Sequence, residues 1–159
     1  MKPKLSATSI DDAEQLVAIR IAAMQESLLR IGRFDPVRAR DRFLSGFRPE
    51  QCWFIHVGDQ AAGFLSLDLE GDPLLLQHLY LLPAFQNQGL GSMLMQMICA
   101  EADRRALPIK VGALRESDSN RFYLHHQFEQ VSEEEWDIYY IRTPRPATGS
   151  VHPLFGTDK

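Results

Sequence analysis

The chain has 159 residues, of which 45% are hydrophobic and 24% charged, with a formal net charge of −4 at pH 7. This length suits one compact domain, and the composition is typical of globular proteins. The negative charge argues against a nucleic-acid partner, because such binding needs cations that neutralise phosphates. No apolar run reaches the ~20 residues of a membrane span, and no signal peptide follows Met1. We therefore expect a cytoplasmic protein without a nucleic-acid or membrane partner.

The cysteines and histidines do not show the spacing of a metal site. Cys52 and Cys99 lie far apart in the sequence, and none of the five histidines stands at ligand spacing from either of them. Reduced, structural thiols are the usual form of such cysteines in the cytoplasm. We expect no bound metal.

The first part of the chain predicts a short strand followed by two helices. The strand is an apolar segment around Leu5, and Ser9-Ile10-Asp11-Asp12 is a capping signal for the first helix, which Gly32 ends. The second helix begins at Asp35-Pro36. The apolar face of the first helix repeats at helical spacing. It consists of Ala13, Leu16, Val17, Ile21, Met24 and Leu28.

The pattern then becomes extended before one more long helix. Three strands are predicted in succession, separated by turns at Gly58-Asp59 and Gly71-Asp72-Pro73. They cover Cys52–Val57, Ala61–Leu69 and Leu74–Leu82. A helix follows from Gly89 to Arg105, and Met95 falls outside its apolar stripe. We expect Met95 to be exposed or to contact another subunit.

The last part of the chain predicts a strand, a short helix and two more strands. These elements cover Ile109–Leu114, Ser119–His126, Phe128–Val131 and Trp136–Ile141. We expect a single domain over residues 1–143 and a loose tail over residues 144–159, which is rich in Pro, Gly, Thr and Ser. Antiparallel hairpins followed by a strand-helix-strand crossover predict a mixed α/β (α+β) fold with helices packed on a central sheet.

The most informative segment joins the long apolar strand to the next helix and reads Gln86-Asn87-Gln88-Gly89-Leu90-Gly91-Ser92. The first N–H groups of a helix have no internal acceptor, and the helix dipole adds about half a positive charge there. Gly89 and Gly91 lack a Cβ, so a phosphate can approach the backbone closely, and Ser92 adds a hydroxyl. A pyrophosphate is therefore the expected ligand.

Two other nucleotide motifs do not fit this segment. A P-loop requires Gly-Lys-Ser/Thr, and the segment contains no lysine. A dinucleotide fingerprint requires a small residue where Leu94 stands, and an acidic residue after the next strand that is not obvious here. The remaining alternative is a glycine-containing turn that only packs.

Gln86-x-x-Gly89-x-Gly91 resembles the Q/R-x-x-G-x-G/A signature of the GNAT superfamily of N-acetyltransferases. The order of elements also resembles that fold from about Leu5 to Arg142. The resemblance implies a central, mostly antiparallel, twisted sheet of about six or seven strands flanked by about four helices. It also implies an acyltransferase that uses acetyl-CoA as cosubstrate and needs no metal.

The same resemblance implies a set of cofactor-binding residues. In the family, main-chain amides of this turn hold the pyrophosphate of coenzyme A, and the preceding strand pairs with the pantetheine arm. By position, the pyrophosphate residues are Gln86, Asn87, Gln88, Gly89, Leu90, Gly91 and Ser92, and the strand residues are Leu79, Tyr80 and Leu81. The N–H of Leu81 is expected to polarise the thioester carbonyl.

The segment from Ser117 to Phe128 resembles a second signature of the family, a short helix ending Y-x-x-x-G-F. Tyr123 takes the position of the tyrosine, which implies that its hydroxyl protonates the departing thiolate of coenzyme A. A core tyrosine without a chemical role is the alternative. Asn120 is expected to contact coenzyme A. The usual glycine is Gln127 here, where a left-handed turn would favour glycine.

No residue of the sequence identifies the general base. His78, Glu26 and Glu116 are candidates, and a chain of water molecules would serve equally well. The linker between the first two helices and its surroundings are basic, which could favour an acceptor with a carboxylate or phosphate. The basic residues are Arg30, Arg33, Arg38, Arg40, Arg42 and Arg48. A solvated helix face explains them as well.

Together these features predict an N-acetyltransferase. The acetyl group would pass from acetyl-CoA to a primary amine of a small molecule or peptide, by direct attack in a ternary complex. A non-catalytic module that binds or senses acyl-CoA is the alternative. The sequence leaves the acceptor open, and it leaves a homodimer open too, since many members of the family are dimers.

Overall fold

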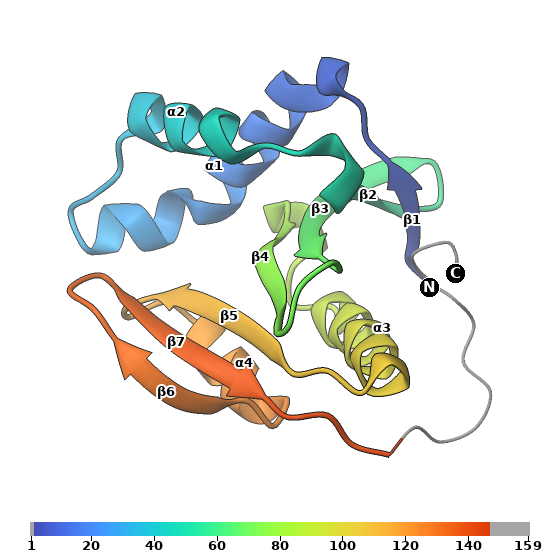
Figure 1. Ribbon diagram of the computed structural model, residues 1–159. Coiled ribbons are helices and arrows are strands. Elements are labelled where there is room, and N and C mark those ends of the chain that lie inside the picture. The colour runs from blue at the N-terminus through green and yellow to red at the C-terminus, as the bar shows by residue number, and fades with distance from the viewer. Residues whose placement is uncertain (1, 147–159) are drawn as a thin grey trace. The chain divides into compact units, whose positions relative to one another are not determined.

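The computed structural model describes residues 2–146 (Figure 1). Residues 147–159, which make up most of the predicted tail, lie outside the described residues. The chain divides into two compact units. Unit 1 consists of Met1–Leu67 and His78–Leu90, and unit 2 of Asp68–Gln77 and Gly91–Lys159. The expectation of a single domain over residues 1–143 stays a prediction.

Unit 1 contains a small antiparallel sheet and two helices. Its strands are β1 (Lys4–Ala7), β2 (Cys52–Val57) and β3 (Gln60–Asp68), and its α-helices are α1 (Ala13–Arg30) and α2 (Pro36–Gly46). Two short 3-10 helices, η1 (Ile10–Asp12) and η2 (Pro49–Gln51), precede α1 and β2. Strand β4 (Leu74–Leu81) begins in unit 2 and ends in unit 1. Strand β2 pairs antiparallel with β1 on one side and with β3 on the other. Helices α1 and α2 lie side by side (Figure 1).

The helix boundaries of unit 1 confirm the predicted capping signals. The Ser9 hydroxyl accepts a hydrogen bond from the N–H of Asp11, and the Asp12 carboxylate accepts one from the N–H of Ser9 at 2.8 Å. Gly32 has a φ of 72° just after α1, a conformation that glycine adopts without strain. The Asp35 carboxylate accepts the N–H of Arg38 at 3.1 Å and so caps α2.

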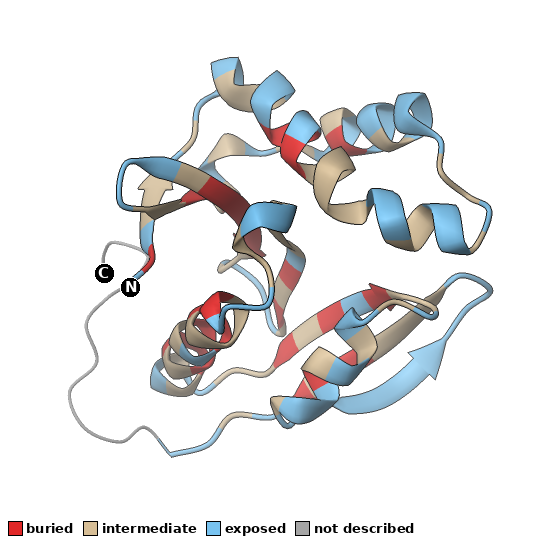
Figure 2. Ribbon diagram, turned by 180° about the vertical axis from the view of Figure 1, so that it is seen from behind, coloured by how far each residue is buried: buried red, intermediate tan, exposed pale blue. Residues whose placement is uncertain are grey.

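The core of unit 1 lies between the two helices and the strands. Buried aliphatic residues of α1 meet buried aromatic residues of α2, β2 and β3 (Figure 2). The cluster consists of Leu16, Val17, Ile19, Phe43, Cys52, Phe54 and Phe64. Tyr80 and Leu82, from the end of β4 and just after it, pack against this cluster while staying partly exposed.

Unit 2 contains the remaining strands and two helices. These are α3 (Leu90–Arg105), whose first residue belongs to unit 1, β5 (Ile109–Leu114), α4 (Ser119–His125), β6 (Glu129–Glu133) and β7 (Asp137–Arg142), with the first residues of β4. Strand β5 pairs antiparallel with β7, and β7 with β6. Helix α4 contacts β5, and β6 is exposed along its whole length (Figure 2). Strand β6 is therefore a solvated edge strand.

Helix α3 is buried along a wider face than the sequence predicts. Met95 is 0% exposed, so the expectation that it is exposed or meets another subunit is wrong. The buried positions occupy two neighbouring stripes of the helix rather than one. The buried apolar residues are Leu90, Leu94, Met95, Ile98, Cys99 and Ala102, and Glu101 is buried beside them. A helix with so broad an apolar face must be covered over much of its circumference.

The predicted fold class is confirmed. Seven strands hydrogen-bond in the order β1-β2-β3-β4-β5-β7-β6, and the described residues contain four α-helices. The pairs β1–β2, β2–β3, β5–β7 and β6–β7 are antiparallel, and the pair β4–β5 is parallel. No helix among residues 2–146 combines the length and the apolar character that crossing a membrane requires.

Candidate active site

The end of β4 lies against β3 in unit 1 at unusually close range. A Cβ added to Gly63 of β3 would lie 1.9 Å from the carbonyl oxygen of Tyr80, so only glycine allows this approach. The N–H of Leu82 donates to the carbonyl of Ala62 at 2.8 Å. The strand segment predicted to face the pantetheine arm, Leu79 to Leu81, is thus held firmly on its β3 side.

The other side of β4 pairs with β5 at the beginning of both strands. This parallel ladder, which lies in unit 2, joins Leu74–Leu76 to Ile109–Val111. The ladder thus joins the first three residues of each strand.

The turn after β4 is braced by side-chain amides. After the 3-10 turn η3 (Pro83–Phe85), the Gln86 side chain donates to the carbonyl of Leu81 at 2.8 Å, and the Gln88 side chain donates to that of Ala84 at 2.9 Å. Gln86 therefore ties the turn back to the end of the strand. Its predicted contact with the cofactor stays a prediction.

The backbone of this turn exposes a set of N–H donors. Asn87 has a φ of 62° and Gly89 a φ of 81°, whereas Gln88 between them is not left-handed. Such alternation turns neighbouring N–H groups toward one concave side, where anions bind. Among residues 2–146, no main-chain hydrogen bond outside helices and strands has a donor between Asn87 and Gly89. The first turn of α3, from Leu90, adds further N–H groups that have no acceptor within the helix.

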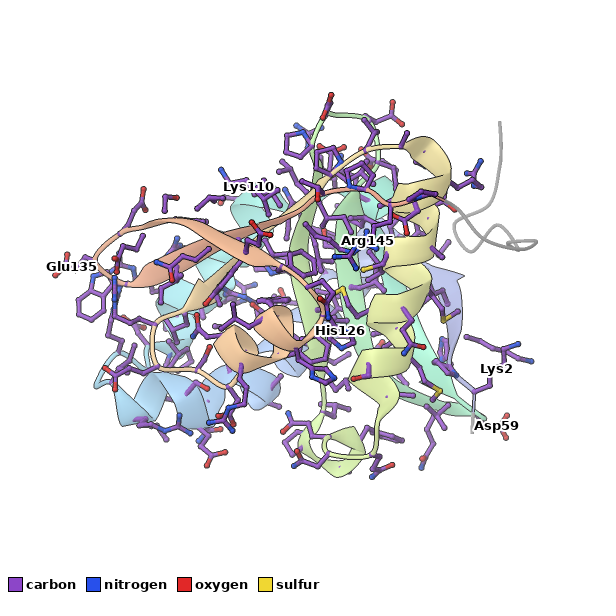
Figure 3. All side chains as sticks on the ribbon, turned by 90° about the horizontal axis from the view of Figure 1, so that it is seen from below. Lys2, Asp59, Lys110, His126, Glu135 and Arg145 are labelled. Atoms are coloured by element: carbon purple, nitrogen blue, oxygen red, sulfur yellow. The ribbon has the colours of Figure 1, made fainter. Side chains whose placement is uncertain are left out.

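Ser92, in the first turn of α3, has a partner that the sequence did not suggest. Its hydroxyl lies 3.1 Å from Nε2 of His126, a residue at the end of α4 that is labelled in Figure 3. Burial, and then the neighbouring His125, lower the pKa of His126. The imidazole is therefore mainly neutral at pH 7 and can position the Ser92 hydroxyl. No local motif could have revealed a contact between two helices.

Tyr123 lies on α4 inside an aromatic cluster of unit 2. The side chain is 7% exposed, and its ring centroid lies 5.5 Å from that of Phe128 and 5.9 Å from that of Tyr140. Gln127 adopts a φ of 73°, and the N–H of Phe128 donates to the carbonyl of Tyr123 at 3.1 Å. The turn that glycine usually makes is thus present with glutamine, at a cost of ~1 kcal/mol.

Asn120, at the start of α4, uses its side chain to hold three segments together. Its amide nitrogen donates to the carbonyls of Leu114 and Ser117, each at 3.0 Å, and its oxygen accepts the hydroxyl of Tyr140 at 2.7 Å. These bonds favour a positioning role. The predicted contact of Asn120 with coenzyme A stays a prediction.

The candidate bases have very different surroundings. Burial, and then the charge of Arg20, lower the pKa of His78 to about 3, so its imidazole is neutral but too weakly basic to hold a proton taken from an amine. Glu26 is exposed and lies 3.9 Å from Arg30 in a surface ion pair. Glu116 is exposed as well. A chain of water molecules is therefore at least as good a route for the proton as any of these side chains.

Among residues 2–146, no cluster of three or more His, Cys, Asp or Glu could hold a metal ion.

Comparison with known proteins agrees with this geometry. The family model of the acetyltransferase (GNAT) domain matches residues 48–130, just over half of the 159-residue chain. This stretch includes both strands of the close β3–β4 contact, the turn and Tyr123. No curated protein sequence matches the chain.

Several solved structures share the fold. The PaiA N-acetyltransferase from Thermoplasma acidophilum, solved in complex with coenzyme A, matches with a TM-score of 0.73 and 15% identity, over 90% of this chain and 99% of that chain. PH1933 from Pyrococcus horikoshii gives a TM-score of 0.71 at 15% identity, over 91% of this chain and 99% of that chain. A GNAT-family acetyltransferase from Bacillus cereus gives a TM-score of 0.63 at 16% identity, over 91% of this chain and 99% of that chain. With the family match, these likenesses lead to one conclusion: the chain belongs to the GNAT family of acetyltransferases, which are acyltransferases that use acyl-CoA.

Proposed function

We propose that the protein is an N-acetyltransferase that moves the acetyl group of acetyl-CoA to a primary amine of a small molecule or peptide. The observation that carries the proposal is the set of N–H groups from Asn87 to Gly89, which donate to no main-chain carbonyl in the turn and lead directly into the first turn of α3. A pyrophosphate is the anion that so many converging donors suit. The PaiA N-acetyltransferase, which has the same fold, was solved with coenzyme A.

The donors of the turn act together with the start of a long helix. Helix α3 runs for 16 residues, so the partial positive charge at its first turn is fully developed. An anion at such a terminus is stabilised by about 0.3–2 kcal/mol through the dipole, and hydrogen bonds to a charged group add about 1.5–3 kcal/mol each. The Ser92 hydroxyl, held by His126, would add one more donor.

The remaining roles follow from the family positions. When bound, acetyl-CoA supplies the acetyl group as a thioester, which an amine attacks in a single ternary complex. A C–N bond forms and the C–S bond breaks. The N–H of Leu81 would donate to the carbonyl oxygen as negative charge develops on it. The Tyr123 hydroxyl would give its proton to the departing thiolate, and the amine would lose its proton to water.

The proposal is tested by separating binding from turnover. Calorimetric titration should show binding of acetyl-CoA and not of ATP or NAD. Release of free thiol with a panel of primary amines should then identify accepted substrates. Binding without thiol release for any amine would point to a sensing module instead, and a preference for ATP or NAD would overturn the cofactor assignment.

Tyr123→Phe sharpens the same test. The change removes only the hydroxyl, and the ring can keep its contacts with Phe128 and Tyr140. We expect kcat to fall about 100- to 10,000-fold, the range typical of general acid catalysis, while the Kd of acetyl-CoA stays within about twofold. A large loss of affinity with unchanged kcat would contradict the role of proton donor.

A further inference from the structure

Two buried nitrogen atoms of unit 1 have no hydrogen-bond partner. They are Nε of Arg20 on α1 and Nδ1 of His78 on β4. Among residues 2–146, the only other buried side-chain atom of this kind is the neutral hydroxyl oxygen of Ser117. Folded proteins pair nearly all of their buried polar atoms, because an unpaired one loses its hydration without return. The two unpaired nitrogen atoms of unit 1 therefore mark a place where a ligand or an ordered water would complete the hydrogen bonds.

The two side chains lie against the same part of α2. The His78 ring centroid lies 5.5 Å from that of Phe43, one helical turn beyond Ala39, the residue whose carbonyl Arg20 contacts. The charge of Arg20 also contributes to the lowered pKa of His78. Nη1 of Arg20 donates to the carbonyl of Ala39 on α2 at 2.8 Å, which fixes the guanidinium between the two helices. No ion pair among the described residues includes Arg20. Its charge is thus held in place and is not neutralised by a carboxylate of the protein.

The surroundings of the pair are aromatic. The His78 ring centroid lies 5.5 Å from those of Phe43 and Tyr80 and 5.9 Å from that of Phe64. Aromatic walls exclude water and strengthen the interaction of a fixed cation with an anion. With its proton on Nδ1, the neutral imidazole offers a second donor next to the guanidinium. One positive charge and two N–H donors suit the two oxygens of a carboxylate.

We propose that Arg20 and His78 bind the carboxylate of the acetyl acceptor, so that the substrate is an amine that also carries a carboxylate. The inference rests on the proposed function, since it names the acceptor of that reaction. His78 precedes Leu81, the residue expected to face the thioester carbonyl, by three positions along β4. At ~3.3 Å per residue the two positions lie about 10 Å apart. The amine and the carboxylate of the acceptor must therefore be separated by several bonds.

This site differs from the basic surface that the sequence suggested. Arg30 and Arg40 of that surface are engaged in exposed ion pairs, with Glu26 and with Glu14. Arg20 lies on the same helix as Arg30 but faces inward with an unpaired Nε. The arginine that matters here is thus one that local charge density does not reveal.

The test compares ω-amino acids of increasing length with alkylamines of the same length, by thiol release in the presence of acetyl-CoA. We expect the wild type to prefer the ω-amino acids, with an optimum at several methylenes. Arg20→Gln should lower kcat/KM for these acids about 10- to 100-fold and leave the alkylamines within about twofold. His78→Phe, which keeps an aromatic ring in place, should lower it about tenfold. Arg38→Gln, which removes an exposed charge from α2, is the matched control and should change neither.

A second readout does not depend on turnover. Calorimetric titration of the best ω-amino acid should show binding to the wild type and to Arg38→Gln, and at least tenfold weaker binding to Arg20→Gln, while acetyl-CoA binds all three proteins equally. If thiol release fails for every amine but the acid still binds through Arg20, the proposed function fails and the site stands. If the acids show no advantage over alkylamines, or Arg20→Gln leaves that advantage intact, the site is wrong and the unpaired atoms are bridged by water.

Discussion

Units 1 and 2 differ in whether their buried polar side chains have hydrogen-bond partners. In unit 2, Arg142 is 5% exposed and donates two hydrogen bonds to Asp103, at 2.9 and 3.1 Å. Asp103 also accepts the N–H of Arg145, a residue labelled in Figure 3. Glu101 is 2% exposed and is paired with both Arg104 and Arg105. In unit 1, by contrast, Arg20 and His78 keep buried nitrogen atoms without a partner.

This contrast separates structural from functional polar groups. A buried charge with a complete set of partners fixes the packing of the elements that carry it, as Arg142 of β7 does with Asp103 of α3. A buried donor without a partner weakens the fold and is retained where a ligand completes it. The lowered pKa of Asp103 agrees with a structural role of its ion pair. Burial alone would raise the pKa of Asp103, but hydrogen bonds from Arg142 and Arg145 outweigh it and the pKa is lowered.

The largest effect on stability is expected when one partner of a buried ion pair is removed. Asp103→Asn removes the counter-charge and leaves the guanidinium of Arg142 buried, so the free energy of unfolding should fall by about 3–5 kcal/mol. Denaturation with urea at pH 7 measures this loss. Glu14→Gln, which removes the partner of the exposed Arg40, is the control and should change stability far less, because water and salt screen an exposed ion pair. Equal effects of the two changes would mean that unit 2 does not depend on its buried pair.

In unit 1 we expect a smaller change in the free energy of unfolding, and an increase rather than a decrease. His78→Phe replaces an imidazole with an unpaired Nδ1 by an apolar ring among aromatic neighbours, which should raise the free energy of unfolding by about 1 kcal/mol. His56 provides a matched control in the same unit, because its Nε2 lies 2.8 Å from the Ser6 hydroxyl. His56→Phe should lower stability by about 1 kcal/mol. A destabilising His78→Phe would show that the imidazole has a structural partner after all.

The sequence predicted the elements of the fold well wherever the signal is local. Strands Cys52–Val57 and Ile109–Leu114 begin and end where predicted, because runs of β-branched and apolar residues are bounded there by turn residues. The start of the helical segment that η1 and α1 form together follows from the reciprocal bonds of Ser9 and Asp12, which cap η1. The turn proposed to bind the pyrophosphate is also a local signal, since its glycines, the preceding strand and the following helix are consecutive in the chain.

What the sequence could not predict depends on contacts between distant elements. Arg20 of α1 and His78 of β4 lie against the same part of α2, and the Ser92 hydroxyl of α3 lies 3.1 Å from Nε2 of His126 after α4. Neither arrangement leaves a pattern of residue spacing. Met95 was misjudged because a single helical stripe is narrower than the buried face of α3. The last strands begin one residue later than predicted, since left-handed Gln127 extends the turn that precedes β6.

The most direct test of the central claim is a comparison of two glycines by calorimetric titration with acetyl-CoA. Gly89 and Gly58 have similar backbones, with φ of 81° and 62°, and at neither does an added Cβ meet any atom within 4 Å. Alanine at either position should therefore cost a similar ~1 kcal/mol of stability. Only Gly89→Ala alters the turn that presents its N–H groups to the pyrophosphate. We predict that it weakens acetyl-CoA binding by about tenfold or more, while Gly58→Ala binds like the wild type. Unchanged affinity in a folded Gly89→Ala protein would contradict the assignment of this turn.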